Sequence, residues 1–370
     1  MDHYAEPLQC RDEQSLLKAI ALVPDNWEYY MGLADLDQDH ARELLNTSLR
    51  MDRYNALANI ELGWQSESEG DYAGAEKSLL AAFDVDRTYP PRWNLAEYYF
   101  RRNNLPAFWS WARSAADMPA DDIEPLFELC WEVAPDPEMI AHTVLGDKPQ
   151  LMHQYTDFLL GKDQLDAAAM MAQRLVHTGT PDGDRPLLFS TINQLAAAND
   201  GLAANALWQS LIEQHWVIAD NTTPNNGEFV REPLPVSFDW SLPEYPGLHS
   251  WPGPGGLETE FSGSQPEDCI VAEQVVRLAP GNYTMDFAYH TADIPSDTGI
   301  HWEIIDTNSN AVIAKSTDLS SPVLKSSSLS FSVPPGASLL RVRLGYQRAL
   351  GTPRVSGTLV VLSSDIKANP

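Results

Sequence analysis

Cysteine and basic residues are scarce in this sequence of 370 residues. The three cysteines, Cys10, Cys130 and Cys269, are far apart and odd in number, which argues against a disulfide framework and against a paired-cysteine metal site. Lys and Arg total 24 against 52 Asp and Glu, so the net charge is −28 at pH 7. Nucleic acids and anionic membrane surfaces bind clustered Lys and Arg, so we expect neither as a partner.

Long hydrophobic runs and known catalytic motifs are also missing. No apolar run reaches the ~18 residues of a membrane span, and the start, MDHYAEPLQC, lacks the basic and apolar regions of a signal peptide. The sequence contains no HExxH, GxSxG, phosphate-binding glycine loop or CxxC. We therefore expect no cofactor and no catalytic residue, although a glycoside hydrolase whose two acids meet only in space would show no such motif.

One acidic stretch, DLDQDHARELLN (residues 35–46), begins like a calcium-binding loop because aspartates alternate in it. His40 stands where such a loop needs glycine, and Asn46 stands where it needs a bidentate glutamate. The aspartates instead precede a predicted helix, whose N-terminus favours negative charge. We expect no metal at this stretch, and the sequence leaves open whether the second half of the chain binds a structural calcium.

The first part of the chain, residues 1–217, consists mainly of helix-forming residues with apolar positions three and four apart. ARELLNTSLRMDR (residues 41–53) and AEKSLLAAFDVDR (residues 75–87) resemble each other at an interval of 34 residues, the period of the tetratricopeptide repeat. In the best unit, Gly63 and Ala75 are expected to let two helices cross closely, and Gly70 to end the first helix. Such hairpins must stack to bury their apolar faces. We predict about ten short helices that form an α-solenoid.

The first helix of each repeat unit is expected to line the concave face of the solenoid. By spacing, this face includes Trp64 and Glu67 in one unit and Asn94, Tyr98 and Arg101 in the next. One interpretation is a groove that binds a peptide or a helix of a protein partner. The other is ordinary solenoid surface, with Trp64 and Tyr98 half buried.

After a predicted linker at residues 218–224, the pattern changes to alternating strands rich in β-branched and aromatic residues. Eight to ten such strands with no helix among them predict an antiparallel β-sandwich or jelly roll over residues 225–370. In GIHWEI (residues 299–304), alternation places Trp302 in the core and Glu303 on the outer side.

The stretch FDWSLPEYPGLHSWPGPGG (residues 238–256) holds several aromatic side chains among four prolines. A sugar site needs aromatic surfaces and polar side chains outside the core, and loops on a rigid sandwich commonly hold binding residues. We predict Trp240, Tyr245, His249 and Trp251 as ligand-binding residues. The alternative, which we favour for Trp240, is that these side chains cover the sandwich edge or the joint with the solenoid.

Several stretches resemble a group of large tetratricopeptide proteins of acidobacterial type, and the match covers most of the chain from about residue 50. They include LFELCWEVAPDPEMI (126–140), NNGEF (225–229), FDW (238–240), ETEFSGSQPEDC (258–269) and QVVRLAPGNYTM (274–285). In that group a helical repeat region precedes a sandwich that resembles carbohydrate-binding modules. The resemblance implies an extracytoplasmic or cell-envelope location. The N-terminus is expected to be either a nonstandard cap of the solenoid or the remainder of a longer chain whose missing upstream segment includes an export signal, and we favour the second interpretation.

Together these features predict a non-enzymatic interaction protein. The solenoid is expected to bind a protein partner, and the sandwich a glycan or another cell-envelope component. One alternative is a structural subunit in which both domains bind only protein. A glycoside hydrolase is the third.

Overall fold

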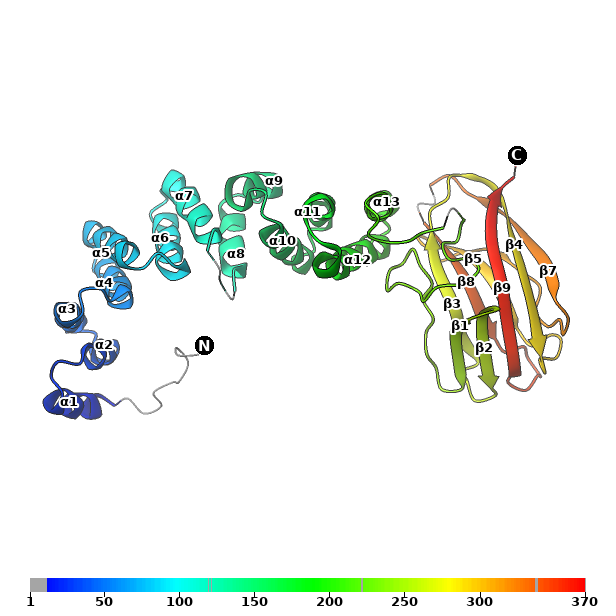
Figure 1. Ribbon diagram of the computed structural model, residues 1–370, viewed down its shortest axis with the longest axis horizontal. Coiled ribbons are helices and arrows are strands. Elements are labelled where there is room, and N and C mark those ends of the chain that lie inside the picture. The colour runs from blue at the N-terminus through cyan, green and yellow to red at the C-terminus, as the bar shows by residue number, and fades with distance from the viewer. Residues whose placement is uncertain (1–11, 119, 121, 221, 337–338, 370) are drawn as a thin grey trace. The chain divides into compact units, whose positions relative to one another are not determined.

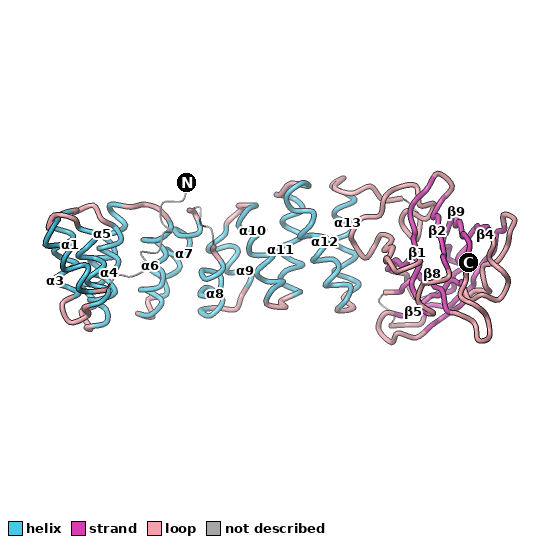
Figure 2. The backbone as a smooth tube through the Cα atoms, turned by 90° about the horizontal axis from the view of Figure 1, so that it is seen from below, coloured by secondary structure: helices cyan, strands magenta, loops and turns pink. Residues whose placement is uncertain are grey.

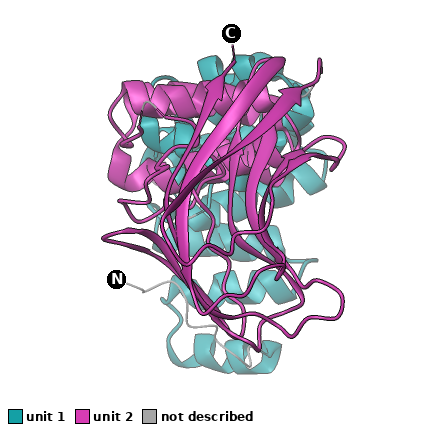
Figure 3. Cartoon of the chain, turned by 90° about the vertical axis from the view of Figure 1, so that its right-hand side faces the viewer, with its two compact units in different colours: residues 1–154 teal, residues 155–370 magenta. Residues whose placement is uncertain are grey.

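The computed structural model describes residues 12–369 except residues 119, 121, 221, 337 and 338, so Cys10 lies outside the described part. The chain divides into two compact units, residues 1–154 and residues 155–370 (Figure 3). Within the described residues, thirteen α-helices and one π-helix come first and nine strands follow. The predicted fold class, helical hairpins of tetratricopeptide type followed by an antiparallel β-sandwich, is confirmed.

The first unit is built of short helices joined by tight turns (Figures 1 and 2). Side-chain caps begin several of them: Asn55 accepts a hydrogen bond from the backbone N–H of Ala58, and Asp71 accepts one from Gly74. The helices are α1 (Glu13–Leu22), α2 (Trp27–Leu36), α3 (Ala41–Met51), α4 (Ala56–Ser68), α5 (Tyr72–Val85), α6 (Tyr89–Arg101), α7 (Leu105–Ala116), α8 (Glu124–Val133), α9 (Pro137–Ile140) and the π-helix η1 (Ala141–Leu145), and α10 (Pro149–Gly161) begins in this unit.

The hairpin of α4 and α5 shows why the repeat needs small residues. A Cβ atom on Gly63 would lie 2.8 Å from Cγ of Leu79, and both Leu79 and Ala75 are fully buried. Gly70 has a φ of +83°, a conformation that side chains with a Cβ atom disfavour. The predicted roles of Gly63, Ala75 and Gly70 are therefore confirmed.

The second unit contains the last helices and the sandwich together. After α10 come α11 (Leu165–Thr178), α12 (Pro181–Ala197) and α13 (Gly201–Glu213). Trp208 of α13 stacks on Phe238 with ring centroids 6.1 Å apart. The Asn193 side chain of α12 donates to the carbonyl of Pro235 and accepts from the backbone N–H of Ser237. These contacts join the segment before the sandwich to the last helical hairpin within the second unit.

Two antiparallel sheets form the sandwich. The five-stranded sheet has the order β1-β2-β9-β4-β7 and the four-stranded sheet the order β3-β8-β5-β6. Trp302, predicted to be a core residue, is fully buried between the sheets. The strands are β1 (Leu248–Gly253), β2 (Gly256–Ser262), β3 (Asp268–Val276), β4 (Gly281–Ala292), β5 (Ile300–Asp306), β6 (Val312–Lys315), β7 (Lys325–Val333), β8 (Leu340–Gln347) and β9 (Ser356–Ala368).

Strand register decides which side chains share a face of the five-stranded sheet. Phe261, Leu359 and Met285 point into the core, so the side chains that alternate with them lie on the opposite side. We call that side the outer face. It carries His249 and Trp251 of β1, Glu258 and Glu260 of β2, Thr358, Val360, Ser363, Asp365 and Lys367 of β9, Asp286, Ala288 and His290 of β4, and Ser326 and Ser328 of β7.

Candidate functional site

Trp240 is a core residue, and its prediction as a ligand-binding residue is wrong. Its side chain is 1% exposed and packs between Phe229 and Trp302, with ring centroids 4.9 Å and 6.0 Å away. The indole N–H donates to the carbonyl oxygen of Asn226 at 3.1 Å. Both the ring and its polar group are therefore occupied inside the sandwich, as the favoured alternative expected.

His249 and Trp251 form a ring pair on the outer face. They stand two residues apart on β1, so alternation places both on the same side of the strand. Their ring centroids are 4.9 Å apart and the ring planes are inclined by 32°. His249 is exposed and Trp251 is half-buried. The sheet therefore presents an aromatic surface to solvent on its edge strand.

Tyr245 lies beside this ring pair, in the turn that leads into β1. It packs partly against the sandwich core and bridges to Leu248. Gly247 in the same turn has a φ of +81°, and a Cβ atom there would lie 2.2 Å from Oγ of Ser264. Only glycine fits this position without strain, so the turn holds Tyr245 and His249 in fixed places.

A pocket of about 650 Å³ opens where this turn meets β2 and β9. We call it the Tyr245 pocket. His249 is part of the pocket wall. Trp251 is not, but it packs next to His249 in the ring pair. The wall combines aromatic rings, two carboxylates and hydroxyl groups: Glu244, Tyr245, Gly247, Leu248, His249, Glu260, Phe261, Ser262, Ser356, Gly357 and Thr358. Such a mixture can hold the apolar face of a ring and hydrogen-bond its polar substituents.

The polar half of this face is not evident from the sequence. Glu260 is opposite His249 in the register, and Thr358 is opposite Glu260. Alternation alone places each of them on the solvent side of its strand. Only the strand order puts β9 beside β2, so residues almost a hundred positions apart in the chain meet.

The four-stranded sheet has a polar outer side of a different kind. Glu303 of β5 is opposite Arg343 of β8 and Lys315 of β6, and Arg343 is opposite Glu273 of β3. Nε of Arg343 lies 2.6 Å from Oε2 of Glu273, and Nζ of Lys315 lies 3.5 Å from Oε1 of Glu303. These charges satisfy each other, which makes this side a poorer ligand surface than the outer face of the five-stranded sheet.

The predicted groove of the first unit is only partly exposed. Trp64 is 46% exposed, whereas Asn94 and Tyr98 are buried at 6% and 4%. Asn94 accepts a hydrogen bond from the Trp64 indole N–H at 2.8 Å, and the Tyr98 hydroxyl donates to the carbonyl of Tyr72 at 2.8 Å. Asn94 and Tyr98 therefore do not line a groove, and the prediction for these two residues is wrong. Their side chains complete the packing between neighbouring helices instead.

Glu67 and Arg101, the other two predicted groove residues, form an ion pair between α4 and α6. Nη2 of Arg101 lies 2.8 Å from Oε2 of Glu67. Arg101 is the more exposed partner, with a side-chain exposure of 40% against 16%. The pair leaves Arg101 within reach of a partner, while Glu67 is mostly used within the unit.

A small pocket of about 290 Å³ lies beside Trp64, among α2, α3 and α4. Its wall includes Asp35, Gln38, Glu61, Trp64 and Gln65. Burial of Glu61, together with the negative charge of Asp35, raises the pKa of Glu61 to about 7. The pocket therefore combines an exposed aromatic ring with acidic side chains.

The potential metal-ligating side chains and the two thiols of the described residues are dispersed or buried. Among residues 12–369, outside the five undescribed positions, no three His, Cys, Asp or Glu side chains are grouped so that they could hold a metal ion. Burial raises the pKa of Cys130 to about 12 and that of Cys269 to about 11, so both thiols stay protonated at neutral pH. No helix in the described residues is both long enough and apolar enough to cross a membrane.

Comparisons with known proteins give resemblances of fold. No family model matches the chain, and no curated protein matches it either. Among solved structures, a CBM4 carbohydrate-binding module is 13% identical with a TM-score of 0.32, over 40% of this chain and 100% of its own. TmCBM61 in complex with β-1,4-galactotriose is 12% identical with a TM-score of 0.25, over 41% and 100%. YrrB, a TPR protein with an unusual peptide-binding site, is 13% identical with a TM-score of 0.27, over 55% and 93%.

Proposed function

We propose that the β-sandwich binds a glycan on the outer face of its five-stranded sheet. The observation that carries this proposal is the His249–Trp251 ring pair beside the Tyr245 pocket. A sugar ring has an apolar face of C–H groups and an edge of hydroxyls. Aromatic rings suit the first, and carboxylates and hydroxyl groups suit the second.

The polar groups around the ring pair have the right roles for this ligand. A carboxylate such as Glu260 accepts hydrogen bonds from sugar hydroxyls, and Thr358 both donates and accepts. The ring pair stands on a strand that pairs with β2 along its whole length, and Leu248 before His249 is buried in the core, so the pair is held in place before the ligand arrives. Such preorganisation reduces the entropic cost of binding.

A titration of the full chain with soluble neutral polysaccharides of plant, bacterial and fungal origin tests this proposal. Trp251→Ala is expected to weaken binding about tenfold or more, because removal of a stacked ring costs about 1.4 kcal/mol or more. Tyr54→Ala is the matched control, since Tyr54 is 63% exposed and lies in the other unit. Absence of binding to every polymer, or equal losses in both variants, would contradict the proposal.

We also propose that the helical hairpins of the first unit bind a protein partner at Trp64. Its ring is exposed while its N–H is held by Asn94, and exposed anchored aromatic side chains are common in protein interfaces. A stoichiometric partner that co-purifies with the full chain should be lost with Trp64→Ala and retained with Tyr54→Ala. If the partner co-purifies with both variants, this part of the proposal is contradicted.

The remaining parts of the proposal concern setting and chemistry. We propose a non-enzymatic protein of the acidobacterial type of tetratricopeptide protein, located outside the cytoplasm. Cell fractionation of the source organism with an antibody against this chain tests the location.

Two alternative functions have their own tests. Release of reducing sugar from a bound polysaccharide, lost with Asp365→Asn, would instead support a glycoside hydrolase. A partner that binds the sandwich, with no glycan binding, would support a purely protein-binding subunit.

A further inference from the structure

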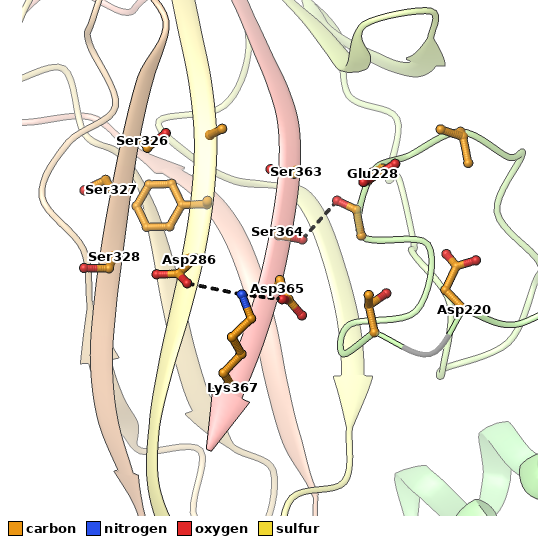
Figure 4. A pocket seen from close by; sticks show the side chains of 15 residues that line it. Asp220, Glu228, Asp286, Ser326, Ser327, Ser328, Ser363, Ser364, Asp365 and Lys367 are labelled. Carbon is orange, nitrogen blue, oxygen red and sulfur yellow. Dashed lines mark hydrogen bonds and ion pairs between the residues drawn. The ribbon is translucent and has the colours of Figure 1, made fainter. Parts of the chain in front are cut away.

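A second pocket lies on the same outer face, at the other side of the sheet. Its volume is about 780 Å³, and its lining comes from β4, β7, β9 and a segment that contributes Asp220 and residues between 222 and 230 (Figure 4). In the register, Asp365 of β9 is directly opposite Asp286 of β4, which is opposite Ser328 of β7. We call this second pocket the Asp365 pocket. The polar side chains of three neighbouring strands therefore meet at its floor.

The wall of the Asp365 pocket is held in a defined conformation. The backbone N–H of Ser364 donates to the carbonyl of Gly227 at 2.8 Å, so the segment pairs with β9. A Cβ atom on Gly227 would lie 2.2 Å from the carbonyl oxygen of Ser364, which requires glycine there. Nη1 of Arg231 lies 2.7 Å from Oδ1 of Asp220, so an ion pair joins the two ends of this segment. Glu228, between these anchors, lines the pocket.

The floor offers hydrogen-bonding groups that the protein itself does not use up. Nζ of Lys367 lies 3.0 Å from Oδ2 of Asp365 and 3.6 Å from Oδ2 of Asp286. One lysine is therefore shared by the two carboxylates, and two carboxylates together can accept more hydrogen bonds than one ammonium group donates. Asp286 and Asp365 are 53% and 30% exposed in their side chains, so a ligand can reach them. Ser326, Ser328 and Ser363 add hydroxyl groups around them.

The charges of this pocket select between ligand classes. Arg231 compensates Asp220. Among the described residues that line the pocket, Lys367 is the one basic side chain against Asp286, Asp365 and Glu228, so negative charge is in excess. An anionic ligand such as a uronic acid would meet like charge in a partly desolvated site. Neutral hydroxyl groups, in contrast, donate strong hydrogen bonds to carboxylates. The chemistry favours an uncharged ligand rich in hydroxyl groups.

We propose that the Asp365 pocket is a second sugar subsite, and that the outer face therefore binds a neutral oligosaccharide several residues long in preference to an acidic one. This inference rests on the proposed glycan binding at the ring pair. His290 and Val360 belong to the row of Trp251, and Asp286 is four residues from His290 on β4, about 14 Å along the strand at ~3.4 Å per residue. A long oligosaccharide reaches both sites, whereas a disaccharide occupies one.

The test is calorimetric titration of the full chain with neutral oligosaccharides of about two and about six residues, cut from whichever neutral polymer binds best. Asp365→Asn is expected to weaken binding of the longer sugar about tenfold and to leave the shorter unchanged, since a charge-assisted hydrogen bond is lost. Asp268→Asn is the matched control, because Asp268 is exposed on β3 of the other sheet. Ser328→Ala gives a second variant with no change in charge, and it should reduce binding of the longer sugar only.

Each outcome decides a different part of the inference. An oligogalacturonate of equal length should bind more weakly than the neutral sugar. Asp365→Asn should reduce this difference in affinity between the two sugars, and it should do so more than Asp268→Asn. Equal affinity for the longer sugar in Asp365→Asn, Ser328→Ala and Asp268→Asn would overturn the second subsite while glycan binding at the ring pair stands. Tighter binding of the oligogalacturonate would overturn the charge preference. Absence of binding to any neutral oligosaccharide would overturn the proposed function and this inference together.

Discussion

Glu61 carries a cost to folding that depends on pH. Its pKa rises from 4.5 to about 7 because the side chain is partly buried and because Asp35 adds negative charge nearby. When the pKa of a carboxyl group is higher in the folded state than in the unfolded state, ionisation of that group lowers the free energy of unfolding. The cost is therefore absent below about pH 4.5, grows as the pH rises toward about 7, and stays constant above that.

The magnitude follows from the difference between these two pKa values. At about 1.36 kcal/mol per pKa unit, the full difference corresponds to about 3.4 kcal/mol. Glu61 is still partly exposed, and solvent screening reduces this value to roughly half, ~1.7 kcal/mol. Glu61→Gln removes the ionisation and keeps the shape. We expect this variant to exceed the natural protein in stability by ~1 to 2 kcal/mol at about pH 8, and by less than ~0.5 kcal/mol at about pH 5.

Hydrogen exchange of peptides from α4 at the two pH values measures this difference locally, without unfolding the sandwich. Glu43→Gln is the control, because Glu43 is exposed on α3 and lies outside the pocket beside Trp64. It changes the net charge by the same amount. A gain in protection that is the same at both pH values, or one that Glu43→Gln reproduces, would contradict a folding cost from the ionisation of Glu61.

Three further predictions concern packing and reactivity. Trp240→Ala should destabilise the sandwich by about 3–5 kcal/mol through the cavity it leaves, measured by chemical unfolding, and an unchanged midpoint would place Trp240 outside the core. Gly63→Ala should cost about 1–3 kcal/mol because its methyl group meets Leu79, whereas Gly161→Ala, with nothing within 4 Å, should be neutral or slightly stabilising. The Cys130 thiol should react with a maleimide only after unfolding, as read by peptide mass spectrometry, and labelling of the folded protein would contradict its burial.

The sequence carried enough information for the architecture. The interval of 34 residues and the small residues Gly63 and Ala75 identified helical hairpins, because these features follow from local geometry. Period-two alternation placed Trp302 in the sandwich core for the same reason. What it did not show was that Trp208 and Phe238 stack, which ties the last helical hairpin to the sandwich within one unit.

The candidate site was only half predictable. His249 and Trp251 stand on one short segment, so their pairing is visible in the sequence. Trp240 has the same residue type and the same proline-rich surroundings, yet its ring turns inward to Trp302. Asp286 and Asp365 meet only because β9 lies between β2 and β4, and no local pattern reveals that strand order.

The most direct test of glycan binding is a crystal structure of the full chain with a neutral oligosaccharide that binds it in solution. We predict a sugar ring against His249 and Trp251 on the outer face, with hydroxyl groups hydrogen-bonded to Glu260 or Thr358. A sugar bound instead along the four-stranded sheet, near Arg343 and Glu303, would contradict glycan binding on the outer face.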